Sequence, residues 1–259
     1  MKKVEAVVFD WAGTMIDFGS FAPVSSFIEA FKTLDIVVTV DEARGPMGMG
    51  KRDHIQAIFD LSRVKEQFES GFGRSPNEAD VDDMFKVFVP LNEKVATRHA
   101  TLVPGAADVI ERLQGNGIKI GSTTGYTRSI MRQIVPLAAQ QGYVPDSIVC
   151  IDDVEHGRPA PDAMLKVLHE LGVSDHTAVL KVDDTVPGIG EGLAIGCHTI
   201  GVSLSGNAVG KTPLALSQMA DEDLAVLRKA AERVLKGAGA HHVIDTVADL
   251  PALIAKLET

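Results

Sequence analysis

The sequence predicts an α/β protein: a doubly wound, mainly parallel Rossmann-like sheet with an inserted all-helical cap domain. Strand and helix signals alternate from residue 101 onwards, which is the pattern of a parallel sheet covered by helices. One strand signal stands alone before residue 18, and residues 19–100 show helical periodicity without a convincing strand pair. We therefore expect a core domain made of 1–18 and 101–259, with a cap domain at 19–100 inserted into it.

The first strand is predicted over the apolar run Ala6 to Phe9, which delivers the carboxylate of Asp10 into a glycine-containing turn. A short apolar run that ends in a turn is typical of a strand buried in a parallel sheet. Ligands of open α/β sheets bind beyond the carboxyl ends of the strands, so Asp10 lies where such a fold does its chemistry. The alternative is that Asp10 only caps the turn, a common role for aspartate.

Composition indicates a globular protein: of 259 residues, 45% are hydrophobic and 23% are charged. The formal net charge of -10 argues against binding to nucleic acid or to an anionic membrane surface. Cys150 and Cys197 lack a CxxC partner and are expected to be buried free thiols. The apolar run after Lys2 and Lys3 is too short for a signal peptide, so we expect a cytoplasmic protein.

Several helices are predicted in the cap region. Thr39 and Glu42 have the spacing of a capping box, and Gly45-Pro46 ends their short helix. Ser75 and Glu78 have the spacing of an N-cap and N3 residue, with proline between them at N1, which predicts a helix start at Ser75. The apolar faces of the other cap helices are carried by Phe27, Ala30, Phe31 and Leu34, by Ile55, Ile58, Phe59 and Leu61, and after Ser75 by Val81, Met84, Phe85 and Phe88, with Leu91 and Val95 extending past Pro90.

The remaining core alternates between the two element types. Glycines close several of the helices, and a proline inside the second of them predicts a bend. Helices are expected at 104–113, 127–139, 161–171, 187–195, 221–235 and 250–257, and strands at 118–121, 147–151, 178–182, 199–204 and 243–244.

Four of the predicted strands end in loops that carry polar groups suited to a phosphoryl group. Asp10 follows the first strand, and Asp183-Asp184-Thr185 offers a carboxylate that can hold a hard divalent cation together with Asp10. The run Ser122-Thr123-Thr124-Gly125-Tyr126 can hydrogen-bond phosphate oxygens, and Arg158 supplies a fixed cation. Each signal alone is weak, because such residues are also common in turns, caps and surfaces. Four in order, at four strand ends, indicate a phosphoryl-transfer site.

This combination resembles the haloacid dehalogenase superfamily, whose members mostly transfer phosphoryl groups through an aspartyl-phosphate. Its phosphatases usually have a second aspartate two residues after the nucleophile, which protonates an alkoxide leaving group. Here that position is Ala12. The leaving group must therefore need no such acid, or must be activated in another way.

Lys51 in the cap region offers another means of activation. A lysine amine condenses with an aldehyde to an imine, which acts as an electron sink. Apolar Met47 and the cations Arg44 and Arg52 would lower the pKa of this amine. His54, one helical turn further on, can move protons during imine formation. Alternatively, Lys51 is a solvated lysine at a helix start and His54 a residue of the helix surface.

The motifs together resemble the phosphonoacetaldehyde hydrolase (phosphonatase) family, which hydrolyses phosphonoacetaldehyde to acetaldehyde and phosphate using Mg²⁺. The resemblance also implies a homodimer formed through the cap domain. The motifs that carry it are Phe9-Asp10-Trp11-Ala12-Gly13-Thr14, Gly19-Ser20-Phe21-Ala22-Pro23, Arg44-Gly45-Pro46-Met47-Gly48 with Lys51 and His54, and Ser122-Thr123-Thr124-Gly125-Tyr126.

The resemblance implies a role for each candidate residue. Asp10 is expected to attack phosphorus and Lys51 to form the Schiff base. The expected site residues are Asp10, Lys51, His54 and Met47 for catalysis, Thr124, Gly125, Tyr126 and Arg158 for the substrate, and Asp10, the backbone carbonyl of Ala12, and Asp184 for Mg²⁺.

Two positions depart from the expected pattern. Gly188 stands four residues after Asp184, where many superfamily members carry another aspartate near the metal. The sequence leaves open whether Asp183 or Glu191 compensates. Ser20 stands where some members have a cysteine, so a cysteine is not a general requirement of the mechanism.

Other signals point to other functions. The segment 206–212 resembles a P-loop, but Ser205 stands at the first required glycine and Pro213 follows at once. His241-His242 and Asp152-Asp153 lack further ligands at the spacing of a zinc site. Two alternatives to carbon–phosphorus hydrolysis stay open: a phosphatase or phosphomutase acting on phosphate esters, and a non-catalytic sensor of a phospho-ligand.

Overall fold

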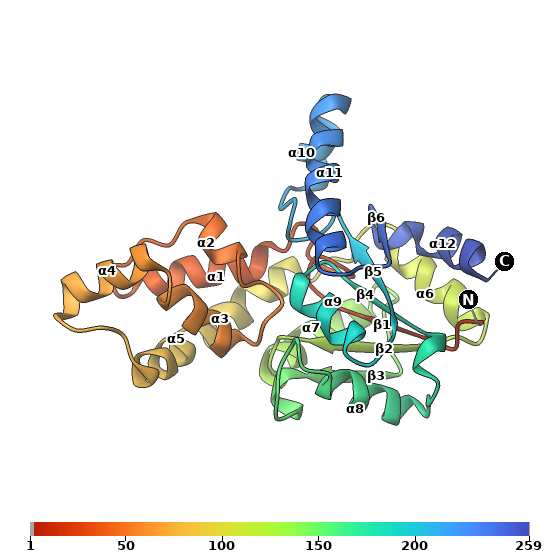
Figure 1. The fold of residues 1–259 in the computed structure, drawn as a ribbon, viewed down its shortest axis with the longest axis horizontal. Coiled ribbons are helices and arrows are strands. Elements are labelled where there is room, and N and C mark those ends of the chain that lie inside the picture. The colour runs from red at the N-terminus through yellow and green to blue at the C-terminus, as the bar shows by residue number, and fades with distance from the viewer. Residues whose placement is uncertain (1–2, 259) are drawn as a thin grey trace.

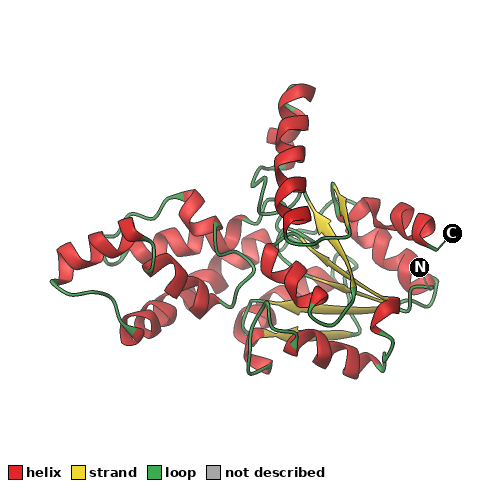
Figure 2. Ribbon diagram, in the orientation of Figure 1, coloured by secondary structure: helices red, strands yellow, loops and turns green. Residues whose placement is uncertain are grey.

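A six-stranded sheet forms the centre of the molecule, as the computed structural model of residues 3–258 shows (Figures 1 and 2). The strands pair in the order β3-β2-β1-β4-β5-β6 and all pairs are parallel, which confirms the predicted fold class. The first strand lies between β2 and β4, so the residue after it is central at the carboxyl edge. The strands are β1 (Ala6–Phe9), β2 (Lys119–Thr124), β3 (Ser147–Cys150), β4 (Val179–Asp183), β5 (His198–Val202) and β6 (His242–Ile244).

Helices cover both faces of the sheet. Val7 and Phe9 of β1 pack on one layer of helices, whereas Ala6 and Val8 pack on the opposite layer. This alternation explains why the first strand is buried along its whole length. The first layer consists of α6 (Ala106–Gly115), α7 (Arg128–Ala139) and α12 (Leu250–Leu257), and the second of α8 (Asp162–Leu171), α9 (Val186–Leu193) and α11 (Asp221–Gly237).

The cap is a bundle of helices between β1 and β2, and in Figure 1 it extends to the left of the sheet. It has a hydrophobic core of its own, in which Phe27 stacks on Phe88 with ring centroids 4.3 Å apart. The domain boundaries at residues 18 and 100 stay a prediction. The cap helices are α1 (Phe21–Lys32), α2 (Val40–Arg44), α3 (Lys51–Phe59), α4 (Ser62–Phe72) and α5 (Glu78–Ala96).

The predicted start of α5 at Ser75 is wrong by two residues. Asn77 is the N-cap: its side chain accepts hydrogen bonds from the N–H groups of Ala79 and Asp80, and the Asp80 carboxylate accepts one from the Asn77 N–H. The hydroxyl of Ser75 donates to Glu69 of α4 instead. An Asn-x-x-Asp capping box therefore takes the place of the expected Ser-Pro start. Helix α4 itself was not distinguished in the sequence.

Strand β2 and the segment before α11 differ from their predicted form. Strand β2 continues to Thr124, so the hydroxyl run expected in a loop begins inside the sheet. Its hydroxyls are satisfied there, since Ser122 accepts a hydrogen bond from the Trp11 indole at 2.9 Å. Helix α11 begins at Asp221, as expected, with Ala220 as its N-cap, and a short helix that was not expected, α10 (Pro213–Ser217), precedes it. Within residues 3–258, no helix is long and apolar enough to cross a membrane.

The cap is closed against the core, and glycines make the contact possible. A Cβ added to Gly125 would lie 2.6 Å from the carbonyl oxygen of Met49 in the cap. A Cβ added to Gly48 would lie 2.2 Å from Oγ1 of Thr185 in the core. The loop 45–50 therefore touches two strand-end loops of the core with no room for a further carbon atom.

We expect Gly125→Ala to open the cap. The backbone of Gly125 suits alanine, so the strain falls on the contact with Met49, and overpacking of this kind costs about 1–3 kcal/mol. Small-angle scattering should give a larger radius of gyration, and proteolysis within 45–50 should be faster. Gly115→Ala is the matched control, because a Cβ there meets no atom within 4 Å. A Gly125→Ala protein as compact and protected as the control would contradict this prediction.

Candidate active site

Asp10 lies at the carboxyl edge of the sheet and is only 6% exposed. The turn that follows passes very close to the loop after β4: Gly13 has φ +89°, and a Cβ there would lie 2.3 Å from Oδ2 of Asp184. Only glycine fits that position. Burial, followed by repulsion from Asp183, raises the pKa of Asp10 to about 6, while the nearby Arg158 opposes this shift.

Three buried carboxylates meet at this edge. Oxygens of Asp10, Asp183 and Asp184 lie within 4.8 Å of one another. Burial and the charges of the other two raise the pKa of Asp184 well above its usual value. Converging, mutually repelling carboxylate oxygens suit a hard divalent cation such as Mg²⁺. The structure thus brings together the two predicted carboxylate ligands and adds Asp183.

Arg158 holds the Asp10 side chain. Its Nη1 donates to Oδ1 of Asp10 at 2.7 Å, and its Nη2 donates to the carbonyl and the hydroxyl of Thr123, both at 2.7 Å. Its Nε donates to Glu191 at 3.1 Å. The guanidinium is thereby held by Thr123 and Glu191 while it binds Asp10, the candidate nucleophile. The predicted contact of Arg158 with substrate oxygens stays a prediction.

Lys181 is a site residue that sequence reasoning missed. It is fully buried in β4, and its Nζ lies 2.7 Å from Oγ1 of Thr123 and 3.1 Å from carboxylate oxygens of both Asp183 and Glu191. The available signal was a lysine in the middle of an apolar strand, since a buried lysine needs an anionic partner. Glu191, named as an alternative metal-supporting acid, instead pairs with Arg158 and Lys181.

The buried charge cluster is short of positive charge. Four carboxylates against two cations leave two negative charges in excess, which a single divalent cation would neutralise. This balance, together with the convergent oxygens, makes the residues fit Mg²⁺. The cluster consists of Asp10, Asp183, Asp184 and Glu191 with Arg158 and Lys181.

Lys51, the first residue of α3, is buried at the cap–core junction with 4% of its surface exposed. Its Nζ lies 5.0 Å from the ring centroid of Tyr126 in the core and 5.8 Å from that of Phe27 in the cap. Burial is the main cause that lowers its pKa to about 8, and Arg158 adds to the shift while Asp10 opposes it. Lys51 is therefore not the solvated lysine of the alternative interpretation.

His54 is buried as well. Its Nε2 donates to the carbonyl of Ala43 at 2.9 Å, and its ring lies 3.8 Å from the ring of Phe27. Burial and the charge of Lys51 hold its pKa well below 6.5, so the ring is neutral. Its Nδ1 has no hydrogen-bond partner among residues 3–258. A neutral ring with a free lone pair can accept a proton, but its predicted role in catalysis stays a prediction.

A small pocket between cap and core, with a volume of ≈ 20 Å³, gathers most of the predicted site. Thr124 lies at its wall and accepts a hydrogen bond from the Tyr126 N–H at 3.1 Å. His54 and Asp184 do not line this pocket. The predicted residues that do are Asp10, Ala12, Met47, Lys51, Thr124, Gly125, Tyr126 and Arg158.

The same pocket contains residues that were not predicted as site residues, among them Ser20 and Thr185. Ser20 precedes α1 with φ 52° in the left-handed region, which is unusual for a residue other than glycine. Its hydroxyl is buried and has no hydrogen-bond partner in the described part of the chain. A strained residue with an unsatisfied polar group is common where a structure binds a ligand.

Comparison with known proteins agrees with this site. The family of haloacid dehalogenase-like hydrolases matches residues 4–196. The chain is 50% identical to a phosphonoacetaldehyde hydrolase of Paraburkholderia phytofirmans, over 100% of this chain and 97% of that protein. The chain belongs to the phosphonoacetaldehyde hydrolase family. It is also 48% identical to a phosphonoacetaldehyde hydrolase of Aeromonas hydrophila, over 98% of this chain and 92% of that protein.

Solved structures support the fold. A phosphonoacetaldehyde hydrolase-like protein from Oleispira antarctica superposes with a TM-score of 0.97 at 44% identity, covering 98% of this chain and 92% of that one. A beta-phosphoglucomutase from Clostridium difficile gives a TM-score of 0.68 at 15% identity, with coverages of 98% and 96%. At 15% identity, the second comparison shows only that the two chains share a fold.

The Asp183 carboxylate occupies the space that a side chain at position 188 would need, so a glycine there is consistent with the site. A Cβ added to Gly188 would lie 2.0 to 2.2 Å from the carboxylate atoms of Asp183. The carboxylate that reaches from β4 therefore fills the place of a side chain at position 188 on α9. Its Oδ1 is fixed by the N–H and hydroxyl of Thr185 at 3.0 and 2.7 Å. The absence of an acid at Gly188 thus leaves no gap in the cluster.

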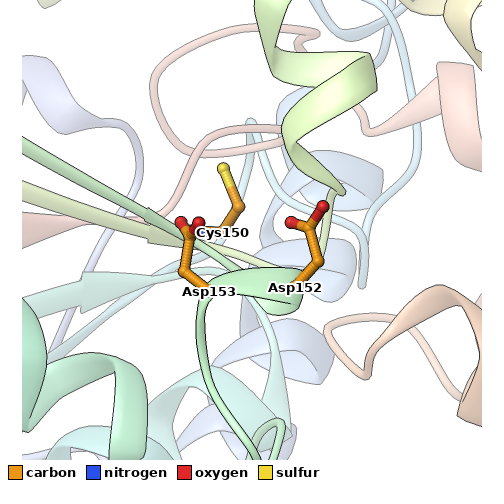
Figure 3. Close-up of side chains that lie close together, drawn as sticks. All are labelled: Cys150, Asp152 and Asp153. Carbon is orange, nitrogen blue, oxygen red and sulfur yellow. The ribbon is translucent and has the colours of Figure 1, made fainter.

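A second acidic group, after β3, needs no metal to explain it. Figure 3 shows Cys150, the last residue of β3, close to Asp152 and Asp153 on the turn that follows the strand. Asp152 accepts from the Arg128 N–H at 2.8 Å, and Asp153 accepts from the Cys150 N–H and pairs with the Arg128 side chain. Burial raises the pKa of the Cys150 thiol to about 12, so it stays protonated. Cys150 and Cys197 are buried free thiols, as predicted.

We expect the carboxylate of Asp183 to be transferable to position 188. Asp183→Gly should raise the Kd for Mg²⁺ at least about tenfold, because it removes one negative charge from the cluster. This change corresponds to a loss of about 1.4 kcal/mol in binding free energy. The double variant Asp183→Gly/Gly188→Asp should recover most of that affinity, since the two side chains occupy one place. Titration calorimetry on the substrate-free protein measures both.

Asp152→Asn serves as the control for a general change in charge, because Asp152 lies outside the cluster. Thermal unfolding of each variant checks that the core is intact. The idea is wrong if Asp183→Gly binds Mg²⁺ as tightly as the unmodified protein, or if the double variant binds no better than the single one.

Proposed function

We propose that this protein hydrolyses the carbon–phosphorus bond of phosphonoacetaldehyde to acetaldehyde and phosphate, the activity named for its close relatives. One observation carries the proposal: a buried lysine with its pKa lowered to about 8 lines the same closed pocket as Asp10. Ala12 lines that pocket too, where an ester-cleaving enzyme would need an acid. The arrangement suits a reaction in which the lysine, not an acid, prepares the leaving group.

The carbon–phosphorus bond explains the need for Lys51. This bond has no oxygen leaving group, so direct attack on phosphorus would expel a carbanion. The neutral Lys51 amine adds to the aldehyde carbon, and loss of water with uptake of one proton from solution gives a protonated imine. The lone pair on Nδ1 of His54 is available for the proton transfers of this step. The protonated imine acts as the electron sink, because it can take up the electron pair that the broken bond leaves on the departing carbon.

Asp10 then attacks phosphorus. Its carboxylate oxygen forms the new bond to phosphorus while the carbon–phosphorus bond breaks, and the released electron pair moves into the enamine of Lys51. Arg158 fixes the attacking carboxylate through Nη1 and offsets the charge of two anions that approach each other. Protonation of the enamine carbon and addition of water release acetaldehyde and free Lys51. Water hydrolyses the aspartyl-phosphate to phosphate and restores Asp10.

The closed cap contributes by excluding water. Met47 and Lys51 from the cap meet Thr124, Gly125 and Tyr126 from the core around the pocket, and their side chains leave little free space. We infer that the substrate oxygens bind at Thr124, Gly125 and Arg158. Dry surroundings protect the imine from premature hydrolysis and keep Lys51 partly neutral.

Mg²⁺ fits the carboxylate cluster as the cofactor. Asp10, Asp184 and the backbone carbonyl of Ala12 would hold it, with Asp183 beside them. When bound, Mg²⁺ acts as a Lewis acid that stabilises negative charge on the phosphoryl oxygens. The protein itself supplies the convergent oxygens and the cations Arg158 and Lys181 behind them.

Lys51 is the residue to trap. Borohydride reduction in the presence of phosphonoacetaldehyde should attach the substrate carbons to Lys51, found by peptide mass mapping. Lys51→Arg should lose the adduct and nearly all turnover, since a guanidinium forms no such imine. An enzyme for phosphate esters would keep substantial activity in Lys51→Arg, and a non-catalytic sensor would lose no function on Asp10→Asn.

The same experiment has a pH dependence. The pKa of Lys51 is lowered from 10.5 to about 8, so the neutral fraction rises with pH and reaches half near pH 8. Trapping should therefore increase about tenfold per pH unit below 8 and level off above it. Lys86, an exposed lysine paired with Asp83, is the internal control and should carry no adduct. An adduct that maps away from Lys51 would falsify the proposal.

We also propose a homodimer formed through the cap. In support, the cap exposes large apolar side chains that its own core leaves uncovered: Val37 is 65%, Val40 51% and Phe72 47% exposed. Sedimentation should give twice the chain mass of 27.6 kDa. Phe72→Asp should shift the protein towards the monomer, whereas Leu214→Asp, on the core helix α10, should not. A monomeric unmodified protein would end this proposal.

A further inference from the structure

The loop after β5 lies directly on the carboxylate cluster. This is the segment whose glycines and lysine resemble a phosphate-binding loop. The Asn207 N–H donates to Oδ2 of Asp184 at 2.7 Å, and a Cβ added to Gly206 would lie 2.6 Å from Cβ of Asp184. Oδ1 of the same carboxylate accepts from the Thr14 hydroxyl at 3.2 Å. The position of this loop therefore fixes one of the two oxygens of Asp184.

The same asparagine binds the cap. Nη1 of Arg44 donates to Oδ1 of Asn207 at 2.9 Å and to its carbonyl at 3.3 Å. In return, Nδ2 of Asn207 donates to the carbonyl of Arg44 at 3.1 Å. Two residues that are 163 positions apart thus bind each other through both side chain and backbone, which joins the cap to the loop after β5.

Arg44 occupies the point where three segments meet. It ends α2, immediately before the loop 45–50 that leads to Lys51. Its Nη1 also donates to the carbonyl of Gly19, next to the crossing from core to cap, at 2.9 Å. A Cβ added to Gly210 would lie 2.6 Å from Cζ of Arg44, so the guanidinium packs on the loop after β5 without space between them. These contacts require the closed cap.

We propose that Arg44 and Asn207 form a latch that couples closure of the cap to the metal-site carboxylate Asp184. The closed cap holds Arg44 against Asn207, and Asn207 holds the Asp184 oxygen in place for the cation. Coupling of this kind is reciprocal, so a cation that orders Asp184 and Asn207 also favours the closed position of Lys51. Both are positioning residues, because neither lines the pocket. The inference rests on the proposed Mg²⁺ site.

Calorimetric titration of Mg²⁺ into the substrate-free protein tests the latch. Asn207→Ala keeps the backbone N–H that meets Asp184 but loses the side-chain bonds to Arg44, and it should weaken Mg²⁺ binding about tenfold. Arg44→Ala should do the same, and the double variant should be no weaker than either single one. Arg44→Lys should recover only part of the affinity, since its ammonium keeps the charge but ends one bond short of the position of Nη1, which makes the bonds to Asn207 and Gly19.

Hydrogen exchange gives a second measurement that does not depend on affinity. In the unmodified protein, Mg²⁺ should slow exchange in residues 44–51, although no cap residue belongs to the proposed cation site. This protection should disappear in Asn207→Ala. Arg63→Ala is the matched control: Arg63 is another cap arginine, but its hydrogen bonds, to Glu42 and to the carbonyl of Val37, stay within the cap.

The outcomes separate the latch from the function on which it rests. If the unmodified protein binds Mg²⁺ and the Asn207 and Arg44 variants bind it equally well, the latch is wrong and the proposed reaction is untouched. Additive losses in the double variant would also overturn it. If the unmodified protein binds no Mg²⁺, the cation site and the coupling fail together, while trapping of Lys51 still tests the imine.

Discussion

Burying carboxylates at one edge of a sheet is possible only when cations are buried beside them. An unpaired buried charge costs several kcal/mol, so each acidic residue here constrains its neighbours. Arg158 and Lys181 reach the cluster from a loop and a strand on either side of β1, and Thr123 lies between them and accepts hydrogen bonds from both. The hydroxyls inside β2 and the lysine inside β4 follow from this requirement rather than from strand propensity.

The cap completes a site that the core alone leaves open. The core supplies anions and their partner cations, whereas the cap supplies an amine that needs dry surroundings to lose its proton. Lys51 gains those surroundings from Phe27 on its own side and Tyr126 on the other. The separation of the two halves keeps nucleophile and amine on different bodies, so the reactive combination exists only when they meet.

Local signals in the sequence predict most of the fold. The apolar run of β1 and the strand–helix alternation after residue 101 depend on neighbours along the chain, which a sequence displays directly. The start of α5 was misplaced because Ser75 and Asn77 both satisfy local capping rules, and only the packed structure shows that Asn77 makes the bonds. Strand β2 was cut short because polar residues normally end a strand.

The site was predicted where its residues follow strand ends, and missed where partners are distant in the chain. Arg44 and Asn207 carry no mutual signal in the sequence, and Lys181 was hidden by the apolar residues around it. Asp183 and Gly188 show a further consequence. Because one place serves both side chains, a single replacement at either position empties it or fills it twice. The carboxylate can move from one position to the other only if both residues change together, so we expect substitutions at positions 183 and 188 to be coupled.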